Sequence, residues 1–227
     1  MPHINKAANR NRRREHRNYY DVLTISSDIF SFENIVKAIK SCAKGVSWKN
    51  SVMKWKIDTI NLAQSLYKKL HNGTYHLSSY MTFKIFYPKQ RVIKSLLFAD
   101  RVVQRVMCFS GLYHDLTRSN IYDNGACQVH KGTTFAIDRM KVLLMKYYKK
   151  HGNHGWVLKL DIHKFFESIP HDKLKEMVHK KVKDKMIGQM VCDIIDSFDG
   201  DRGIGLGSQT SQLLAISFLS DFDHFLK

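Results

Sequence analysis

The chain has 227 residues, of which 44% are hydrophobic, so it is long enough to bury one large core or two smaller ones. Its 37 Lys and Arg residues against 20 Asp and Glu residues leave a net charge of +17, the electrostatic signature of a protein that binds a polyanion. Nucleic acid is the leading partner, because no apolar run approaches the roughly 20 residues of a membrane-spanning helix and no apolar stretch follows the charged N-terminus as in a secretory signal. We therefore expect a cytoplasmic protein with no membrane partner.

The N-terminal region, residues 1–31, is predicted to be a basic arm. Within it, residues 6–17 (KAANRNRRREHR) carry six Lys or Arg residues and one Glu without apolar periodicity. Such a run either pairs with phosphates or remains a solvated tail, and the residues themselves leave both alternatives open.

Two amphipathic helices are predicted next. From Phe32 onward, Ile35, Ile39 and Cys42 fall on one helical face. A second helix is predicted after Asp58, where apolar residues recur at helical spacing until Asn72-Gly73 supplies a stop.

Residues 82–97 (TFKIFYPKQRVIKSLL) predict a hairpin, because two β-rich runs flank the turn Pro88-Lys89-Gln90. Helical spacing resumes from Val103 to Leu112. Residues 117–132 are expected to form loops with a short strand, and a further helix is predicted from Thr133 to Lys150.

Residues 156–162 (WVLKLDI) predict the clearest strand of the chain. Trp156, Leu158 and Leu160 fall on one face by the period of two, which puts Lys159 and Asp161 together on the other face.

The C-terminal part is predicted to return to helices. One begins near Asp172, which is placed to cap it after Pro170. Residues 199–203 indicate a tight turn, and a last helix is expected over residues 208–227 with its apolar side chains inward, namely Leu213, Leu214, Phe218, Phe222 and Phe225. The sequence therefore predicts an α+β protein, mostly helical with a small antiparallel sheet.

The cysteines and histidines give no metal site. Cys42, Cys108, Cys127 and Cys192 lack C-x-x-C spacing, which argues against a zinc knuckle and a disulfide framework and favours buried thiols. His171 and His179 are expected on one helix but stand too far apart to bind one metal ion together.

Asp161 is the main candidate for chemistry. It stands near the end of an apolar strand and is followed by Lys164, Phe165 and Phe166, so a carboxylate lies beside large rings. Taken alone, such an Asp most often caps a turn. Carboxylates in this position also hold Mg²⁺, a hard ion that takes oxygen ligands and is commonly shared with substrate phosphates.

Three segments together resemble reverse transcriptases. Residues 157–174 (VLKLDIHKFFESIPHDKL) are similar to the motif that carries the first catalytic Asp of that family, and residues 203–219 (GIGLGSQTSQLLAISFL) are similar to the next motif. Residues 87–104 (YPKQRVIKSLLFADRVVQ) resemble the basic fingers segment with its Asp-Arg-x-x-Gln element. The series from Leu206 to Gln212 resembles the enzymes of diversity-generating retroelements, and related retron-type bacterial enzymes share parts of it.

The resemblance implies the fingers, residues 32–155, and a partial palm, residues 156–227, of a right-hand polymerase. Such an enzyme adds deoxynucleotides to a primer on an RNA template with Mg²⁺, and an accessory protein is an implied partner. By position, Asp161 and the carbonyl of Ile162 would bind metal, and Asp161 would be the catalytic carboxylate. The remaining residues carried over would bind substrate: Lys89 and Arg91 the triphosphate, Phe166 as the steric gate against a 2′-hydroxyl, and Leu206, Gly207 and Gln212 beside the incoming nucleotide.

The sequence departs from the family pattern in three ways. Gly205 stands where the family usually has Pro, and Ile216 where it usually has Asn. The Y-x-D-D motif of the palm does not occur in the 227 residues, and no thumb is recognised. We therefore expect an incomplete active site and no DNA synthesis by this chain alone, because two-metal phosphoryl transfer needs further carboxylates.

Other functions fit less well. The glycines at 203, 205 and 207 suggest a dinucleotide fingerprint, but the motif requires a glycine where Ser208 stands. Residues 199–201 (DGD) lack the ligand series of a calcium loop. The stronger alternative is a non-catalytic RNA-binding protein derived from a reverse transcriptase, because it has the same charge and needs no missing carboxylates.

Overall fold

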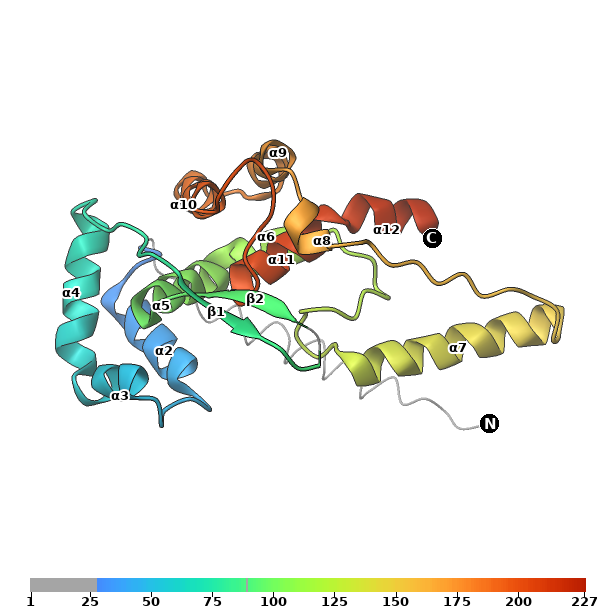
Figure 1. Cartoon of the computed structure of the whole chain (residues 1–227), viewed down its shortest axis with the longest axis horizontal. Coiled ribbons are helices and arrows are strands. Elements are labelled where there is room, and N and C mark those ends of the chain that lie inside the picture. Colours follow the sequence, from blue (N-terminus) through green and yellow to red (C-terminus); the bar gives the residue numbers. More distant parts are fainter. Residues whose placement is uncertain (1–27, 89) are drawn as a thin grey trace. The chain divides into compact units, whose positions relative to one another are not determined.

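The computed structural model describes residues 28–88 and 90–227. These residues are mostly helical and form one two-stranded antiparallel sheet, which confirms the expected α+β class (Figure 1). The basic run at residues 6–17 and Lys89 lie outside the described ranges. The chain divides into two compact units. The first comprises the residues up to His114 together with Gly207–Thr210, and the second comprises Asp115–Leu206 and Ser211–Lys227.

Helix α2 (Phe32–Ala43) is the centre of the first unit. It begins after Ser31, whose side chain accepts a hydrogen bond of 3.3 Å from the backbone N–H of Asn34. Its apolar face packs against α4 (Thr59–His71) and α5 (Phe98–Met107), so the two predicted helices of this region are confirmed. Each aliphatic side chain that this face buries contributes about 1.5–3 kcal/mol.

The rest of the first unit combines one unpredicted helix with a predicted hairpin. Helix α3 (Asn50–Ile57) buries only Val52, and a helix with so narrow an apolar contact leaves little periodic signal. Strands β1 (Met81–Ile85) and β2 (Arg91–Ser95) pair antiparallel, which confirms the predicted hairpin. After α5, the backbone leaves helical geometry at Ser110 and at Gly111, whose φ is +120°, within η1 (Cys108–Leu112). Helix α6 (Tyr113–Thr117) then follows, so the helical spacing from Val103 to Leu112 is interrupted before its end.

The second unit contains one long helix and several shorter ones. Helix α7 (Thr133–His151) confirms the helix expected near Thr133, but it buries none of its side chains. The short helix α8 (Phe165–Ser168) precedes α9 (His171–Lys181), which packs against α10 (Lys185–Asp196). The α9–α10 contact is aliphatic and is formed by Leu174, Val178, Ile187, Val191 and Ile195.

The strand predicted over residues 156–162 is not formed. The segment is irregular, and its apolar side chains are exposed, with Trp156 at 101% and Leu158 at 80% relative exposure (Figure 1). The alternating pattern is that of a half-buried strand, but a strand also needs a hydrogen-bonded neighbour. No described segment provides one.

The helix predicted to begin near Asp172 is α9, and a separate helix, α10, follows it. Pro170 precedes the first turn of α9, and the side chain of Asp172 does not cap it, so that expectation was wrong. The chain leaves helical geometry at Val182, and Asp184 starts α10 by accepting a 2.9 Å hydrogen bond from the N–H of Ile187. The capping carboxylate of Asp184 thus starts a separate helix after α9.

The last predicted helix is also two helices. Helix α11 (Gln209–Phe218) buries Leu213 and Leu214 as expected, but α12 (Ser220–Leu226) leaves Phe222 and Phe225 exposed, contrary to the prediction. The break has a tertiary cause. The buried hydroxyl of Ser220 donates a 2.8 Å hydrogen bond to the carbonyl of Ser119, which fixes the start of α12 on the loop after α6.

Two smaller expectations also failed. No strand occurs within residues 117–132, where turns and bends follow α6. Cys127 in that loop is exposed, whereas the expected burial holds for the other three thiols. A loop that spans only irregular backbone has no second layer to cover the thiol.

Candidate functional site

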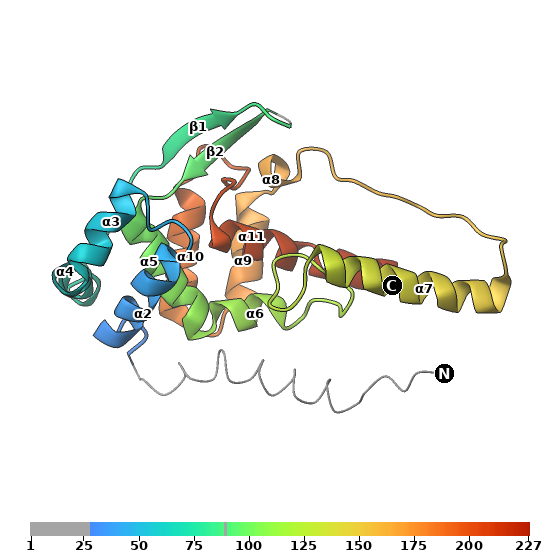
Figure 2. The ribbon, with the colours of Figure 1, turned by 90° about the horizontal axis from the view of Figure 1, so that it is seen from below.

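The two motif segments of the second unit are joined by backbone hydrogen bonds. Residues 166–171, around α8 and the start of α9, pair with residues 201–204 of the glycine-rich turn (Figure 2). The bonds run from the N–H of Ile204 to the carbonyl of Phe166 (2.8 Å), from Gly203 to Ile169 (2.8 Å), and from His171 to Asp201 (2.9 Å). Pro170 and Arg202 form an antiparallel bridge between them. Segments more than 30 residues apart therefore form one local structure.

His171 closes this junction with its side chain. The imidazole is buried, and its Nε2 donates a 2.7 Å hydrogen bond to the carbonyl of Gly203, since a carbonyl can only accept. Gly203 has a φ of +91°, and a Cβ there would lie 3.1 Å from the carbonyl oxygen of Glu167. Only glycine fits so close an approach at that backbone angle. From the sequence, His171 was considered only as a possible metal ligand. No local sequence pattern indicated its hydrogen bond to Gly203.

Asp161 and Ile162 lie in the exposed irregular segment that precedes α8. The segment ends at Lys164, whose φ of +47° turns the chain into the helix. The carboxylate of Asp161 accepts no hydrogen bond and forms no ion pair with any described residue. One carboxylate and one carbonyl supply only part of the oxygen cage that Mg²⁺ requires.

Further acidic ligands do not gather near Asp161. Among residues 28–88 and 90–227, no three His, Cys, Asp or Glu side chains are grouped so that they could hold a metal ion. Asp223 on α12 instead accepts a 3.2 Å hydrogen bond from the side-chain amide of Asn124. The donor set of the described residues therefore does not by itself fit a pair of Mg²⁺ ions.

The predicted triphosphate contacts lie on the hairpin of the first unit. Arg91 is the first residue of β2, pairs with Ile85 in the ladder, and is exposed. Gly207 belongs to the same unit and stands against β2, because a Cβ there would lie 3.2 Å from Ile93 and 3.3 Å from the carbonyl oxygen of Lys94. The structure thus brings Gly207 to the strand that carries Arg91.

The other predicted substrate residues belong to the second unit. Phe166 is half-buried, and its ring meets that of Phe165 edge to face at 5.8 Å between centroids. Leu206 is half-buried at the end of the turn that is hydrogen-bonded to Phe166. Gln212 is exposed on α11, and its Oε1 accepts a 3.6 Å hydrogen bond from the thiol of Cys127.

The Asp-Arg-x-x-Gln element has a structural Asp. Asp100 is buried in α5 and accepts hydrogen bonds from the Tyr75 hydroxyl at 2.7 Å and from the Ser78 N–H at 3.3 Å. Burial, together with the Asp100 carboxylate, raises the pKa of Tyr75 well above its usual range, so the phenol remains a donor. The strip between α4 and β1 is therefore tied to α5. Gln104 is also buried, and its amide has no partner among the residues the structure describes.

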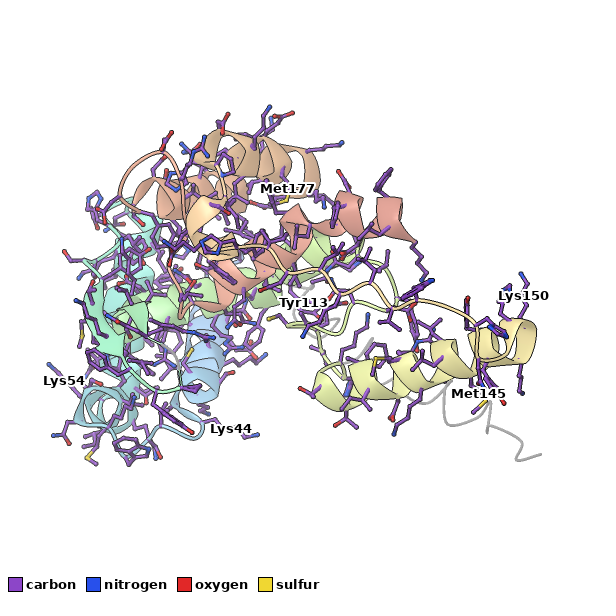
Figure 3. The ribbon with its side chains drawn as sticks, turned by 45° about the vertical axis from the view of Figure 1, so that its right-hand side comes forward. Lys44, Lys54, Tyr113, Met145, Lys150 and Met177 are labelled. Atoms are coloured by element: carbon purple, nitrogen blue, oxygen red, sulfur yellow. The ribbon has the colours of Figure 1, made fainter. Side chains whose placement is uncertain are left out.

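A basic hollow of 420 Å³ lies within the first unit, where α2, α3 and α4 meet. Ile39 and Ala43 contribute apolar walls, and Lys40, Lys44 and Lys56 contribute the charge (Lys44 is labelled in Figure 3). Lysines on a shallow apolar floor are suited to backbone phosphates, which need positive charge but no base-specific contact.

No described helix combines the length and the apolar character needed to cross a lipid bilayer.

Comparison with known proteins gives a partial likeness. No protein-family model matches the chain. A 95-residue stretch is 27% identical to a putative COX1/OXI3 intron 2 protein of Saccharomyces cerevisiae, a match that covers 38% of this chain and 11% of that protein. The chain therefore matches only about a tenth of the length of that relative.

Proposed function

We propose that the chain is the fingers and partial palm of an RNA-directed DNA polymerase. The observation that carries the proposal is the hydrogen-bonded junction between residues 166–171 and 201–204, because it joins the two segments that resemble consecutive polymerase motifs. The likeness to part of an intron 2 protein is compatible with such an origin. The boundaries at residues 31 and 155 stay predictions.

In this proposal the second unit would bind the metal ion and contact the sugar of the incoming nucleotide. Asp161 and the carbonyl of Ile162 would be ligands of Mg²⁺, which supplies charge neutralisation for phosphoryl transfer when bound with further ligands. The Phe166 ring would occupy the space of a 2′-hydroxyl, so that deoxynucleotides are accepted and ribonucleotides refused. Leu206 and Gln212 would lie beside the incoming nucleotide. Leu206 offers no hydrogen-bond donor there.

The hairpin of the first unit would hold the triphosphate. Arg91, with Lys89 at the turn, would place fixed positive charge near its oxygens, and Gly207 would allow close approach of the backbone. The partners would be an RNA template, a nucleic-acid primer, deoxynucleoside triphosphates and an accessory protein. Because only one catalytic carboxylate is recognised, we expect the 227-residue chain alone to bind nucleotide without making DNA.

The test is nucleotide binding by equilibrium dialysis, with each deoxynucleoside triphosphate, Mg²⁺ and a primed RNA. Arg91→Ala should weaken binding of all four nucleotides alike, by about tenfold or more, because a charged hydrogen bond is lost. Phe166→Ala should let the matching ribonucleotides bind as well as the deoxynucleotides. Lys84→Ala, on the exposed strand that pairs with β2, is the matched control and should bind normally.

Absence of nucleotide binding by the folded chain would remove the polymerase proposal. An unchanged affinity in Arg91→Ala would take that residue out of the site. Selective loss for one base would also contradict a triphosphate contact, since all four nucleotides share the triphosphate.

The second candidate function is RNA binding without catalysis, favoured by the lysine hollow of the first unit. Replacing Lys44 and Lys56 with alanine should lower the log–log salt slope of RNA binding by about 0.7–0.9 for each phosphate that is no longer neutralised. Lys173→Ala in the second unit is the control. RNA binding that depends on these lysines, together with no nucleotide binding, would favour this candidate.

A further inference from the structure

Residues 156–162 form an apolar segment whose backbone has no partner. None of their N–H or carbonyl groups is hydrogen-bonded to another residue in the described part of the chain. The large side chains are exposed, from Trp156 at 101% to Ile162 at 44%. Unpaired backbone with alternating apolar residues is a template for strand addition, because each added strand satisfies the backbone and covers one apolar face.

Helix α7 has an apolar face that includes Tyr147, and this residue contacts the chain where it turns back after the helix. The Tyr147 hydroxyl donates a 3.0 Å hydrogen bond to the carbonyl of His154, and a Cβ on Gly155 would lie 2.7 Å from that hydroxyl. Tyr147 therefore faces the returning chain, and Met140, Leu143 and Leu144 share its helical face. These side chains are all exposed; Figure 3 shows the side chains of α7, Met145 and Lys150 among them, projecting on every side of the helix.

We propose that a second copy of the chain pairs antiparallel with residues 157–163 and that the resulting two-stranded sheet shelters the apolar faces of both α7 helices. The pairing is centred on Leu160, which meets Leu160 of the second copy. Leu158 then lies opposite Ile162 on the apolar face. On the other face, Lys159 lies opposite Asp161, and the two-fold symmetry gives this ion pair twice.

Charge and side-chain alternation select this register. Shifting the pairing by one residue would place apolar side chains opposite polar ones. The antiparallel register centred on Lys159 keeps the faces matched but sets the two Lys159 ammonium groups against each other and leaves Asp161 opposite Val157. The register centred on Leu160 is therefore the one in which Lys159 and Asp161 are paired and Leu158, Leu160 and Ile162 share one apolar face.

The pairing goes beyond the proposed function and is tested by the association of the chain instead of by nucleotide binding. Asp161 would be engaged by Lys159 of the second copy, so the dimer is a state in which this carboxylate is not available to a metal ion. A monomeric chain would leave the polymerase proposal intact, and a chain that binds no nucleotide would leave the pairing intact.

The test is sedimentation equilibrium of the full 227-residue chain over a wide concentration range at 0.15 M salt, where long-range repulsion is screened beyond about 8 Å. The chain should associate reversibly to twice its 26.5 kDa mass. Lys159→Glu replaces two attractive pairs by two repulsive ones and should weaken the dimer about tenfold. The double variant Lys159→Glu/Asp161→Lys restores opposite charges and should recover most of the affinity.

A matched control separates strand pairing from bulk charge. Lys84→Glu, on exposed β1, lowers the net charge of +17 by as much as Lys159→Glu does. Lower net charge alone favours association, so Lys84→Glu should leave the dimer unchanged or slightly tighter. Weakening by Lys159→Glu would thus run opposite to the bulk effect. Unchanged helical circular dichroism shows that each variant folds.

Three results would overturn the proposal. A chain that remains monomeric at every concentration has no such pairing. A dimer that is indifferent to Lys159→Glu uses another surface. A dimer weakened by Lys159→Glu but not recovered in the double variant does not have the register centred on Leu160.

Discussion

Helices α2 and α7 are both predicted from the sequence, yet α2 is buried and α7 is not. α2 buries six residues between α4 and α5, whereas α7, although longer, buries none. Periodicity in a sequence reports that a helix has an apolar face. It does not report whether the same chain covers that face. Helix α2 is therefore stabilised by packing within its own unit, whereas the apolar surface of α7 remains exposed.

The anchoring of α7 explains how it stays attached without a core. Its first two turns contact the preceding loop: Arg139 is paired with Asp123 at 2.5 Å, and the rings of Tyr122 and Phe135 meet edge to face at 5.5 Å. Gly125 adds a close contact, since a Cβ there would lie 3.1 Å from that of Ala136. Beyond these turns, the main tie is the bond from Tyr147 to His154. Helix α7 is therefore held by the contacts of its first turns and by the hydrogen bond to the segment that follows its C-terminal end.

The largest expected effect tests burial directly. Ile39→Ala removes a side chain that is 1% exposed in α2 and should cost about 2–5 kcal/mol of the free energy of unfolding. Leu144→Ala on α7, at 51% exposure, should change it by no more than about 0.5 kcal/mol. Urea unfolding, followed by circular dichroism at concentrations where the chain is monomeric, compares the two. Equal costs would mean that the monomer covers α7 after all.

An intermediate effect is expected where hydrogen bonds, rather than apolar burial, fix the chain. His171→Ala leaves the Gly203 carbonyl without its 2.7 Å donor and should cost about 1–3 kcal/mol. Amide exchange at Gly203 and Ile204 should rise with it. Lys180→Ala, at an exposed position on the same helix α9, is the control and should stay near wild type. Unchanged exchange in His171→Ala would show that the backbone bonds suffice.

The smallest expected effect concerns the anchor of α7. The hydrogen bond from Arg139, followed by that from Lys227, lowers the pKa of Asp123 below its ordinary value of 3.8. The stability contributed by the ionised Asp123 is therefore fully present above the ordinary Asp pKa. This stability is lost as the pH falls through the lowered pKa of the folded state. Such a partly exposed pair is worth less than about 1 kcal/mol, so the sensitive measurement is amide exchange in the first turns of α7.

Exchange in these turns should increase on acidification in the wild type. In Asp123→Asn it should already be raised at neutral pH and should show no further acid-dependent step. A wild-type pH profile in that variant would assign the anchor to the ring contacts alone.

The sequence predicted the elements whose signals are local. The α2 stripe, the Asn72-Gly73 stop and the hairpin around Pro88 each depend on neighbours along the chain, and each is confirmed. The separation of α11 from α12 was missed because it depends on Ser220 meeting Ser119, about a hundred residues away. The strand at 156–162 was wrong for the same reason, since pairing is a property of two segments.

The candidate site was predictable to a similar extent. Residue types and motif order singled out Asp161, Phe166 and the glycine-rich turn, but the roles assigned to them stay predictions. The junction that joins Phe166 to Ile204 could not be derived from spacing, and neither could the burial of His171 against Gly203. Both depend on how two distant loops meet.

The open segment at residues 156–162 has a consequence for the lifetime of the polypeptide. Proteases bind their substrates as extended strands, and exposed irregular backbone is where they cut first. Lys159 lies in the middle of this segment, flanked by exposed leucines. Trypsin should therefore cleave there before it reaches the lysines of α9, and the cut would separate α7 from the helices that follow. Any neighbour that adds a strand to this segment would also protect the chain from digestion.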